Sequence, residues 1–415
     1  MTRSTTQIDP EDHEACYRVF QAHEARFDGR LFVGVTSTGI YCRPVCPARA
    51  PKIANCRFFL SAAAAQDAEF RPCLRCRPES APEFSPWRGT SATVSRALVL
   101  IAEGALDNGA AGVEGLAERL GVGGRHLRRL FDRHLGASPV SVAQTRRVLF
   151  AKQLIHETRM PMVEIAMAAG FGSVRRFNET FRTIFHRPPG ELRRGRSTDT
   201  LPADSGVMLH LRYRSPYDWD AMLASLKARA VEGVEVVNEG TYWRTITLDG
   251  ATGSLEVSHS SEHSSLAVLV RFPSVIALSA IIARVRCVFD VGADIETINA
   301  HLARDPLLAP LVARRPGLRA PGSWDTPYRG PDSDAFPASD AALLHRAKAW
   351  RPWRAYAAQH LCITGENRIA ASMPMPGADT NPAGWPLHPK PGRPCRSSSL
   401  PSFDRPSALL LKGRD

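Results

Sequence analysis

Four cysteines stand in two close pairs that can hold a metal ion. Cys42 and Cys46 form the first pair, Cys73 and Cys76 form the second, and the 26 residues 47–72 separate them. Two short cysteine turns can converge on one tetrahedral metal, and four sulfurs without a histidine at matching spacing favour zinc. Arginines flank both pairs, at Arg43, Arg49, Arg57, Arg71, Arg75 and Arg77. We therefore predict a Zn2+ site of net negative charge that lies among cations.

Three runs around these pairs, at residues 27–30, 34–46 and 70–76, carry a longer pattern that includes Cys-Arg-Pro-x-Cys. Over about residues 14–80 the pattern closely resembles the N-terminal domain of the Ada family of adaptive-response proteins. In that family a zinc-bound cysteine takes a methyl group from an alkylated DNA phosphate. The acceptor is the first cysteine of the Cys-Arg-Pro-x-Cys run, so the resemblance implies that Cys42 is the acceptor. The implied activity is that of a stoichiometric methylphosphotriester-DNA:protein-cysteine methyltransferase.

This chemistry agrees with the residue types. A thiolate is a good nucleophile, and a coordinated zinc ion keeps sulfur deprotonated at neutral pH. Arginines such as Arg43 and Arg71, our predicted DNA contacts here, can hold the DNA backbone and stabilise the leaving phosphate. For an arbitrary four-cysteine site a purely structural zinc is the better interpretation, but the arginines and the extended motif favour methyl transfer. Cys56 fits no ligand position, and we expect it to be a small buried hydrophobe.

Composition limits the class of protein. A chain of 415 residues with 44% hydrophobic residues can build about two to four domains. Scattered cysteines, a polar N-terminus and the absence of an uncharged stretch of transmembrane length predict a cytoplasmic protein without a membrane partner. The net charge is +12, and residues 121–196 hold 15 Arg and Lys against 5 Asp and Glu, a local balance of +10. A basic segment in an otherwise nearly neutral chain indicates nucleic acid binding.

The basic segment repeats one unit of helix, tight turn and helix. The expected elements are helices at 113–120 and 124–134 around a turn at 121–122, helices at 162–168 and 173–185 around a turn at 170–172, and a linking helix at 140–156. The second unit and the run 187–193 resemble the AraC-type DNA-binding domain, which places the second helix of each unit in successive major grooves. The Ada family joins these two modules in this order.

The resemblance and the helical periodicity give candidate DNA contacts. They are Arg125, His126 and Arg129 in the first reading helix and Arg175, Arg176 and Asn178 in the second. Arginine can bridge guanine, and asparagine can bridge adenine. Any single arginine is more often a phosphate contact than a base contact. The aromatic residues of the second helix, Phe177, Phe181 and Phe185, are expected in the core.

A third region changes to an α+β pattern. Strands are expected at 207–214, 242–248, 253–260 and 266–272, and helices at 219–231 and 274–290. The runs 215–219, 229–235 and 315–322 resemble the start of the AlkA family of alkylated-base DNA glycosylases. That family continues with a long helical domain that contains a Pro-Gly-Ile-Gly-x-Trp-Thr-Ala hairpin, and this sequence has no such hairpin.

Two pieces of the glycosylase pattern remain. The run 334–340 matches the part that holds the catalytic aspartate, which falls on Asp340, and the run 349–361 matches the final helix. A glycosylase must unstack a base and hold it in a pocket, so we expect little or no glycosylase activity, with Asp340 as a helix N-cap. We also expect the segment 326–361 to expose apolar faces and to be poorly ordered. The tail carries nine of the 32 prolines from residue 371 onward and is expected to be disordered.

The predicted fold class is therefore multidomain: a small zinc-bound α+β domain, an all-α double helix-turn-helix domain, and an AlkA N-terminal-like α+β domain with an incomplete helical glycosylase core. The expected boundaries are a flexible N-terminus at 1–13, the zinc methyl-acceptor domain at 14–80, a linker at 81–92, the helix-turn-helix domain at 93–195, a linker at 196–206, the α+β domain at 207–290, the glycosylase remnant at 291–370 and the tail at 371–415.

The predicted function is a DNA alkylation-damage response. The partners are double-stranded DNA, both alkylated DNA and promoter sites, and RNA polymerase as the partner of a transcription activator. Two alternatives stay open: an active DNA-3-methyladenine glycosylase fused to the regulator, and a transcription factor with purely structural zinc.

Overall fold

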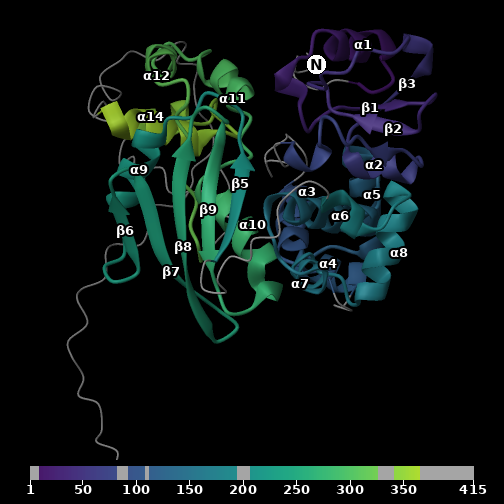
Figure 1. The fold of residues 1–415 in the computed structure, drawn as a ribbon. Coiled ribbons are helices and arrows are strands. Elements are labelled where there is room, and N and C mark those ends of the chain that lie inside the picture. Colours follow the sequence, from purple (N-terminus) through teal and green to yellow (C-terminus); the bar gives the residue numbers. More distant parts are fainter. Residues whose placement is uncertain (1–8, 82–91, 108–111, 194–205, 326–340, 365–415) are drawn as a thin grey trace, which may run out of the picture. The chain divides into compact units, whose positions relative to one another are not determined.

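The computed structural model describes residues 9–81, 92–107, 112–193, 206–325 and 341–364. Figure 1 shows a small N-terminal part with strands β1 to β4, a helical part, and a part built on a larger sheet. Asp340, the predicted tail 371–415, and most of the linkers predicted at 81–92 and 196–206 lie outside the described residues.

The N-terminal part is a four-stranded sheet with the order β3-β1-β2-β4. Its elements are α1 (His13–Gln21), β1 (Phe32–Val35), β2 (Ile40–Cys42), β3 (Cys56–Phe59), α2 (Ala62–Asp67) and β4 (Arg71–Pro72), with 3-10 turns at Ala25–Phe27, Ile53–Asn55 and Pro78–Ser80. β1 is antiparallel to β2 and β3, whereas β2 and β4 are parallel. Because parallel strands end at the same edge of a sheet, the chain leaves β2 and β4 side by side.

Local residues explain this small sheet. Ser61 caps α2, because its side chain accepts the N–H of Ala64. Gly34 in β1 lies against two aromatic rings, and a Cβ there would be 2.8 Å from Phe59 and 2.9 Å from Phe70. Only glycine therefore lets these rings close over the strand.

The helical part follows the predicted repeat. Its elements are α3 (Ala92–Ala102), α4 (Gly112–Arg119), α5 (Gly124–Leu135), α6 (Pro139–Glu157), α7 (Met162–Ala168), α8 (Val174–Phe185) and a 3-10 turn at Pro189–Arg193. Ser138 caps α6 and Ser173 caps α8 through their side chains. The apolar stripe of α5 and the three phenylalanines of α8 are buried, as the helical spacing predicts.

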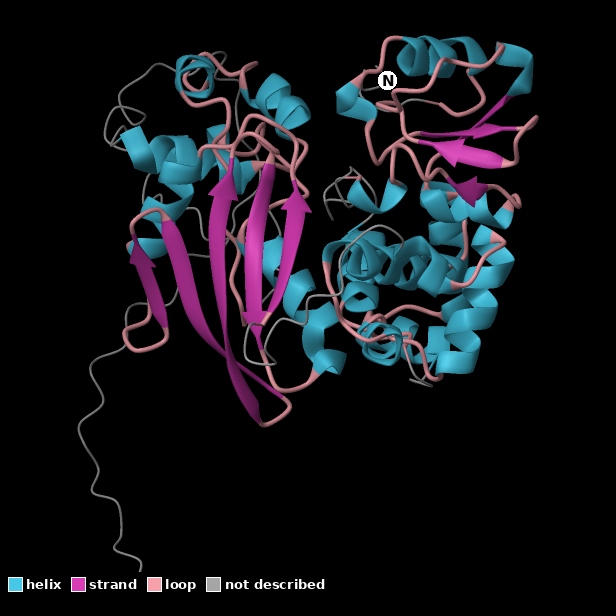
Figure 2. Ribbon diagram, viewed as in Figure 1, coloured by secondary structure: helices cyan, strands magenta, loops and turns pink. Residues whose placement is uncertain are grey.

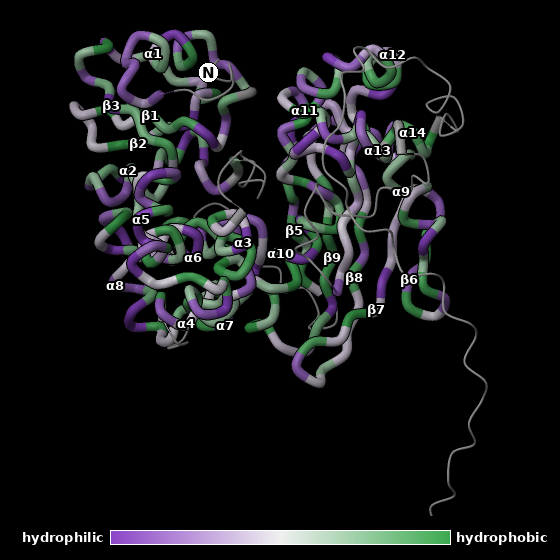
Figure 3. The backbone as a smooth tube through the Cα atoms, turned by 180° about the vertical axis from the view of Figure 1, so that it is seen from behind, coloured by the Kyte–Doolittle hydropathy of each residue, from purple (hydrophilic) through white to green (hydrophobic). Residues whose placement is uncertain are grey.

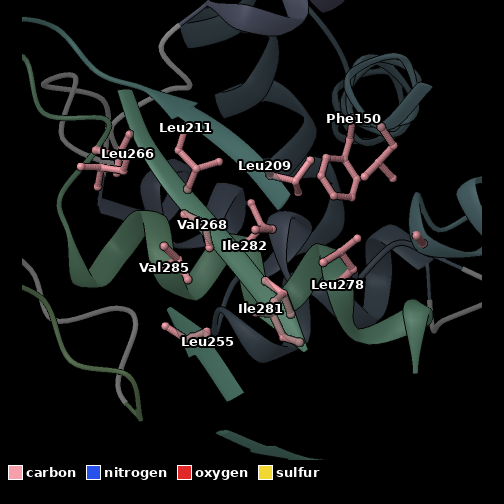
Figure 4. Close-up of a cluster of buried hydrophobic side chains, with 14 of the residues drawn as sticks. Phe150, Leu209, Leu211, Leu255, Leu266, Val268, Leu278, Ile281, Ile282 and Val285 are labelled. Carbon is pink, nitrogen blue, oxygen red and sulfur yellow. The ribbon is translucent and has the colours of Figure 1, made fainter. Parts of the chain in front are cut away.

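The third part contains a five-stranded antiparallel sheet with the order β5-β9-β8-β7-β6 (Figure 2). Its elements are β5 (Val207–Arg212), α9 (Trp219–Lys227), β6 (Glu235–Asn238), β7 (Thr241–Leu248), β8 (Ala251–Ser260), β9 (Ser265–Arg271), a 3-10 turn at Val275–Ala277 and α10 (Leu278–Val288). Figure 4 shows leucine and valine side chains of β5, β8 and β9 facing the isoleucines of α10. The sequence patterns missed β6, which is only four residues long.

The helices after this sheet form a small core of their own. They are α11 (Ile295–Leu302), α12 (Ala309–Arg314), α13 (Ala341–Arg346) and α14 (Arg354–Thr364). Our expectation of exposed apolar faces is wrong for the described residues 341–364, because Leu343, Trp350, Trp353 and Leu361 are buried against α11 and α12. The polar side chain of Asp305 fastens this core: it accepts from Trp350 Nε1 at 2.7 Å and from Arg346 Nε at 2.8 Å.

Hydrophobic and hydrophilic residues alternate along the chain in Figure 3. Within the described ranges, no helix is long and apolar enough to cross a membrane.

Candidate functional site

The four cysteines predicted as zinc ligands lie together. The sulfurs of Cys42, Cys46, Cys73 and Cys76 are all within 4.8 Å of one another, and all four residues are buried. A tetrahedral zinc with Zn–S bonds of about 2.3 Å needs sulfurs about 3.8 Å apart, which a cluster of this size accommodates with small shifts. Four soft sulfur donors at one point select zinc over the hard cations. The residues present therefore fit Zn2+.

The parallel pairing of β2 and β4 brings the two cysteine pairs together. Tyr41 in β2 is paired with Pro72 in β4, so Cys42 and Cys73 follow at the same edge. The N–H of Cys73 donates to the carbonyl of Tyr41 at 3.0 Å. After β2 the chain turns at once, because the N–H of Cys46 donates to the carbonyl of Arg43 at 3.1 Å.

The sulfurs differ in their backbone hydrogen bonds. The N–H of Arg43 lies 3.4 Å from Cys76 Sγ, and the neighbouring backbone N–H groups of Ala48 and Cys76 lower the pKa of Cys46 and of Cys73, respectively. Among the described residues no backbone donor to Cys42 is found. A donor stabilises a thiolate and lowers its reactivity, so Cys42 is the least stabilised of the four sulfurs.

Hydrogen bonds among the four cysteine sulfurs shift their pKa values in opposite directions. The hydrogen bond with Cys46 raises the pKa of Cys42, whereas the hydrogen bond with Cys42 lowers the pKa of Cys73 and lowers the pKa of Cys46 to about 7. A metal ligand must be a thiolate. Metal binding therefore releases protons from this cluster.

Arg43, one of the predicted DNA contacts, has its side chain inside the N-terminal part. Its Nε donates to Asp28 Oδ1 at 2.7 Å, and a second nitrogen donates to the other carboxylate oxygen. Its Nη1 donates to the carbonyl of Cys76 at 3.0 Å. Both Arg43 and Asp28 are less than one-tenth exposed, at 8% and 5%. Arg71, the other predicted contact of this part, is half-buried in β4.

Asp28 is a residue that our sequence reasoning missed as part of the site. It stands in the run 27–30 that carries the family resemblance. A single aspartate fourteen residues before the first cysteine pair has no spacing rule that points to a metal site, and only the fold brings it to Arg43. A buried arginine needs a carboxylate partner. A search for such a partner for Arg43 would have pointed to Asp28.

The predicted contacts of the helical part lie on exposed faces of α5 and α8. Arg125, His126 and Arg129 of α5 are exposed, and Arg129 Nη2 lies 3.1 Å from Nδ1 of His126. On α8, Arg175 and Arg176 are exposed and Asn178 is half-buried. Arg175 Nε donates to Glu179 Oε1 at 2.8 Å, one helical turn later. The roles of both sets as base or phosphate contacts remain predictions.

Comparisons with known proteins match three separate stretches of the chain. Residues 15–79 match the family model described as the metal binding domain of Ada. Residues 116–195 match a helix-turn-helix domain, and residues 208–325 match the AlkA N-terminal domain. The multidomain fold class predicted from the sequence is thereby confirmed.

The chain is 40% identical over 319 residues to the probable bifunctional transcriptional activator/DNA repair enzyme AlkA of Mycobacterium tuberculosis, which covers 76% of this chain and 63% of that relative. It thus spans less than two thirds of the length of that protein. It is 31% identical over 171 residues to the regulatory protein ada of Salmonella typhimurium, covering 41% of this chain and 45% of that relative.

A third relative is matched over most of its length. The chain is 30% identical over 175 residues to the bifunctional transcriptional activator/DNA repair enzyme AdaA of Bacillus subtilis, covering 41% of this chain and 78% of that relative. Together with the convergent cysteines and the repeated helix-turn-helix unit, this similarity shows that the chain belongs to the Ada family of transcriptional activators and DNA repair proteins.

Proposed function

We propose that this protein senses alkylated DNA by taking a methyl group from a DNA methylphosphotriester onto Cys42, and then regulates transcription through α5 and α8. One observation carries the first half of the proposal. Four buried sulfurs converge, and among the described residues Cys42 is the one whose pKa no backbone N–H lowers. Backbone N–H groups stabilise the thiolates of the other three, which suit the role of spectator ligands.

The transfer balances without an added reagent. Cys42 Sγ attacks the methyl carbon of the phosphotriester and forms a carbon–sulfur bond, while the carbon–oxygen bond breaks and its electron pair stays on the phosphate oxygen. The products are a thioether on the protein and an ordinary phosphodiester in the DNA. A bound zinc ion would keep the sulfurs deprotonated at neutral pH. Exposed cations near the cluster, such as Arg75, can hold the phosphate.

The regulatory step follows from charge. Before transfer, four thiolates around a divalent ion carry net negative charge close to a DNA phosphate. The thioether carries one negative charge less, so repulsion between the cluster and the DNA backbone falls and DNA affinity rises. The helical part adds the sequence preference through its exposed arginines. RNA polymerase stays a predicted partner of this activator role.

We propose that glycosylase activity is weak or absent. The family similarity in this region reaches residue 325 and covers the AlkA N-terminal domain. The helices that follow pack on one another around Trp350. A flipped base needs a pocket with stacking walls, and the sequence lacks the hairpin expected there. Release of 3-methyladenine from alkylated DNA, lost on Asp340→Asn, would contradict this part of the proposal.

Methyl transfer is tested by mass spectrometry of the intact wild-type protein. After incubation with DNA that carries methylphosphotriesters, the intact mass should rise by one methyl group, and peptide mapping should place that group on Cys42. Buried Cys16 and Cys56 serve as internal controls within the same domain. A label on Cys46, Cys56 or Cys395, or no mass change at all, would contradict the proposal.

A further inference from the structure

A buried ion pair lies beside the cysteine cluster and has no part in the transfer described above. Arg43 and Asp28 meet through two nitrogens and two oxygens, and their side chains are 10% and 7% exposed. A buried arginine is costly unless a carboxylate and further acceptors satisfy it. Here the remaining donors of the guanidinium reach the second cysteine turn.

Arg43 makes two hydrogen bonds to Cys76, one from its backbone and one from its side chain. Its backbone N–H lies 3.4 Å from Cys76 Sγ, and its Nη1 donates to the Cys76 carbonyl at 3.0 Å. Arg43 thereby connects two ligand turns that are 33 residues apart in the chain. It directly follows Cys42, so one residue links the nucleophile's own turn to the opposite ligand.

The chain geometry after Cys76 is a second, independent observation. Arg77 has a φ of 51°, in the left-handed region that non-glycine residues rarely adopt. Its carbonyl lies 3.5 Å from Nη1 of Arg43. The same guanidinium therefore supports the strained residue that turns the chain away from the cluster.

We propose that Arg43 and Asp28 are positioning residues of the metal centre, and that Arg43 is not a DNA contact. The pair holds Cys76 as a spectator ligand: hydrogen bonding and the nearby positive charge stabilise its thiolate and lower its nucleophilicity. Within the described residues Cys42 receives no such donor, and it keeps its reactivity. This last step rests on the proposed methyl transfer, whereas the positioning role does not.

Zinc release separates this role from DNA binding. In the full-length zinc protein, Arg43→Gln and Asp28→Asn should speed zinc loss to a competing chelator by about tenfold to a hundredfold, the usual effect of removing an outer partner of a ligand. Arg75→Gln is the matched control, because Arg75 lies in the second turn with an exposed side chain and loses the same charge. Equal release from Arg43→Gln and wild type, or equal acceleration in Arg75→Gln, overturns the proposal.

The salt dependence of binding to undamaged DNA tests the alternative, in which Arg43 is a DNA contact. A lost phosphate contact lowers the slope of log affinity against log salt by about 1. We expect no such change in Arg43→Gln, the variant that loses the positive charge, and none in Asp28→Asn. A reduced slope in Arg43→Gln with wild-type zinc retention would make Arg43 a DNA contact and reject the positioning role.

The conservative change Arg43→Lys keeps the charge but not the planar fork that reaches both carboxylate oxygens and the Cys76 carbonyl. It should release zinc faster than wild type, and peptide mapping after treatment with methyl iodide should find label on Cys76 as well as Cys42. If Arg43→Gln binds no zinc at all, Asp28→Glu supplies the graded comparison. In Arg43→Lys, wild-type release together with label on Cys42 but on no other zinc ligand would overturn the proposal; exposed Cys362 is labelled in every variant and is left out of the comparison. Failure of the wild type to accept methyl from DNA would instead reject the proposed function alone, since the release and salt measurements need no transfer.

Discussion

The N-terminal part and the C-terminal helices each contain an aspartate–arginine pair, buried in the first and partly buried in the second, and the two pairs have different roles. Asp28 and Arg43 lie against a cluster of four thiols, and the arginine binds the backbone of one of them. Asp305 and Arg346 lie beside Trp350 and close a core of four short helices. A buried ion pair therefore says little about function by itself. The groups that it positions decide whether it supports chemistry or only packing.

The largest effect should come from the metal centre. Cys73→Ala removes a ligand, and structural zinc sites contribute about 10–16 kcal/mol in small domains, so the N-terminal part should lose zinc and unfold. The sheet of β5 to β9 shares no ligand with this site and should keep its own melting transition. Zinc content and calorimetry would show both results. Full zinc content in the variant would show that Cys73 is not a ligand of the metal centre.

On the packing side, Trp350→Ala should destabilise the C-terminal helices by about 3–5 kcal/mol. Trp350 is 1% exposed and its Nε1 donates to Asp305. Chemical denaturation followed by tryptophan fluorescence would measure the loss, and zinc content should stay that of wild type. An unchanged midpoint would show that the helices do not form the core described here.

A pH titration sharpens the contrast, because the third part contains a carboxyl for which burial outweighs the nearby charge of Arg319. Burial raises the pKa of Asp290 to about 6, and Tyr356 donates to it at 2.7 Å. A raised carboxyl pKa means that the folded state favours the protonated form. The stability that protonated Asp290 contributes to the folded state is complete below the unfolded pKa near 4 and is lost as pH rises through 6.

Wild type should therefore lose stability relative to Asp290→Asn between about pH 4 and pH 6, by an amount on the order of 3 kcal/mol. Denaturation midpoints of both proteins across this range would measure it. Parallel curves for the two proteins would contradict the raised pKa.

The smallest expected effect concerns the exposed pair on α8. Arg175→Ala should weaken binding to a specific DNA site by roughly tenfold to a hundredfold if it reads a base. Glu179→Gln, which frees Arg175 from its 2.8 Å partner, is the comparison variant. Equal weakening on specific and random DNA would assign Arg175 to a phosphate, and binding that ignores salt would reject the electrostatic basis of both changes.

Spacing and periodicity were enough for the parts of this molecule in which one residue type repeats. The cysteine pairs gave the metal cluster, and the apolar stripes gave α5 and α8 to within about a residue at each end. They failed where the outcome depends on a distant partner. Asp28 was not predicted as part of the site, because a sequence does not show that its carboxylate folds against Arg43.

The prediction for the C-terminal helices failed for the same reason. Their apolar faces were expected to lack partners, but these faces pack against α11 and α12. In addition, Trp350 donates to Asp305 and Tyr356 donates to Asp290. Strand β6 was missed because four residues with half-exposed sides carry little alternation. The fold class followed from the sequence, whereas the polar contacts that hold the site and the helices did not.

The two-residue strand β4 has a consequence for chain topology. One of its two residues is a proline, which donates no hydrogen bond to β2. A metal held by Cys46 and Cys73 would close residues 47–72, with β3 and α2 inside, into a ring. By loop-closure arguments a crosslink of that span restricts the unfolded chain by about 3.5 kcal/mol. A bound ion would thus act as a reversible crosslink. Its removal would open this ring and disrupt the reactive centre at the same time.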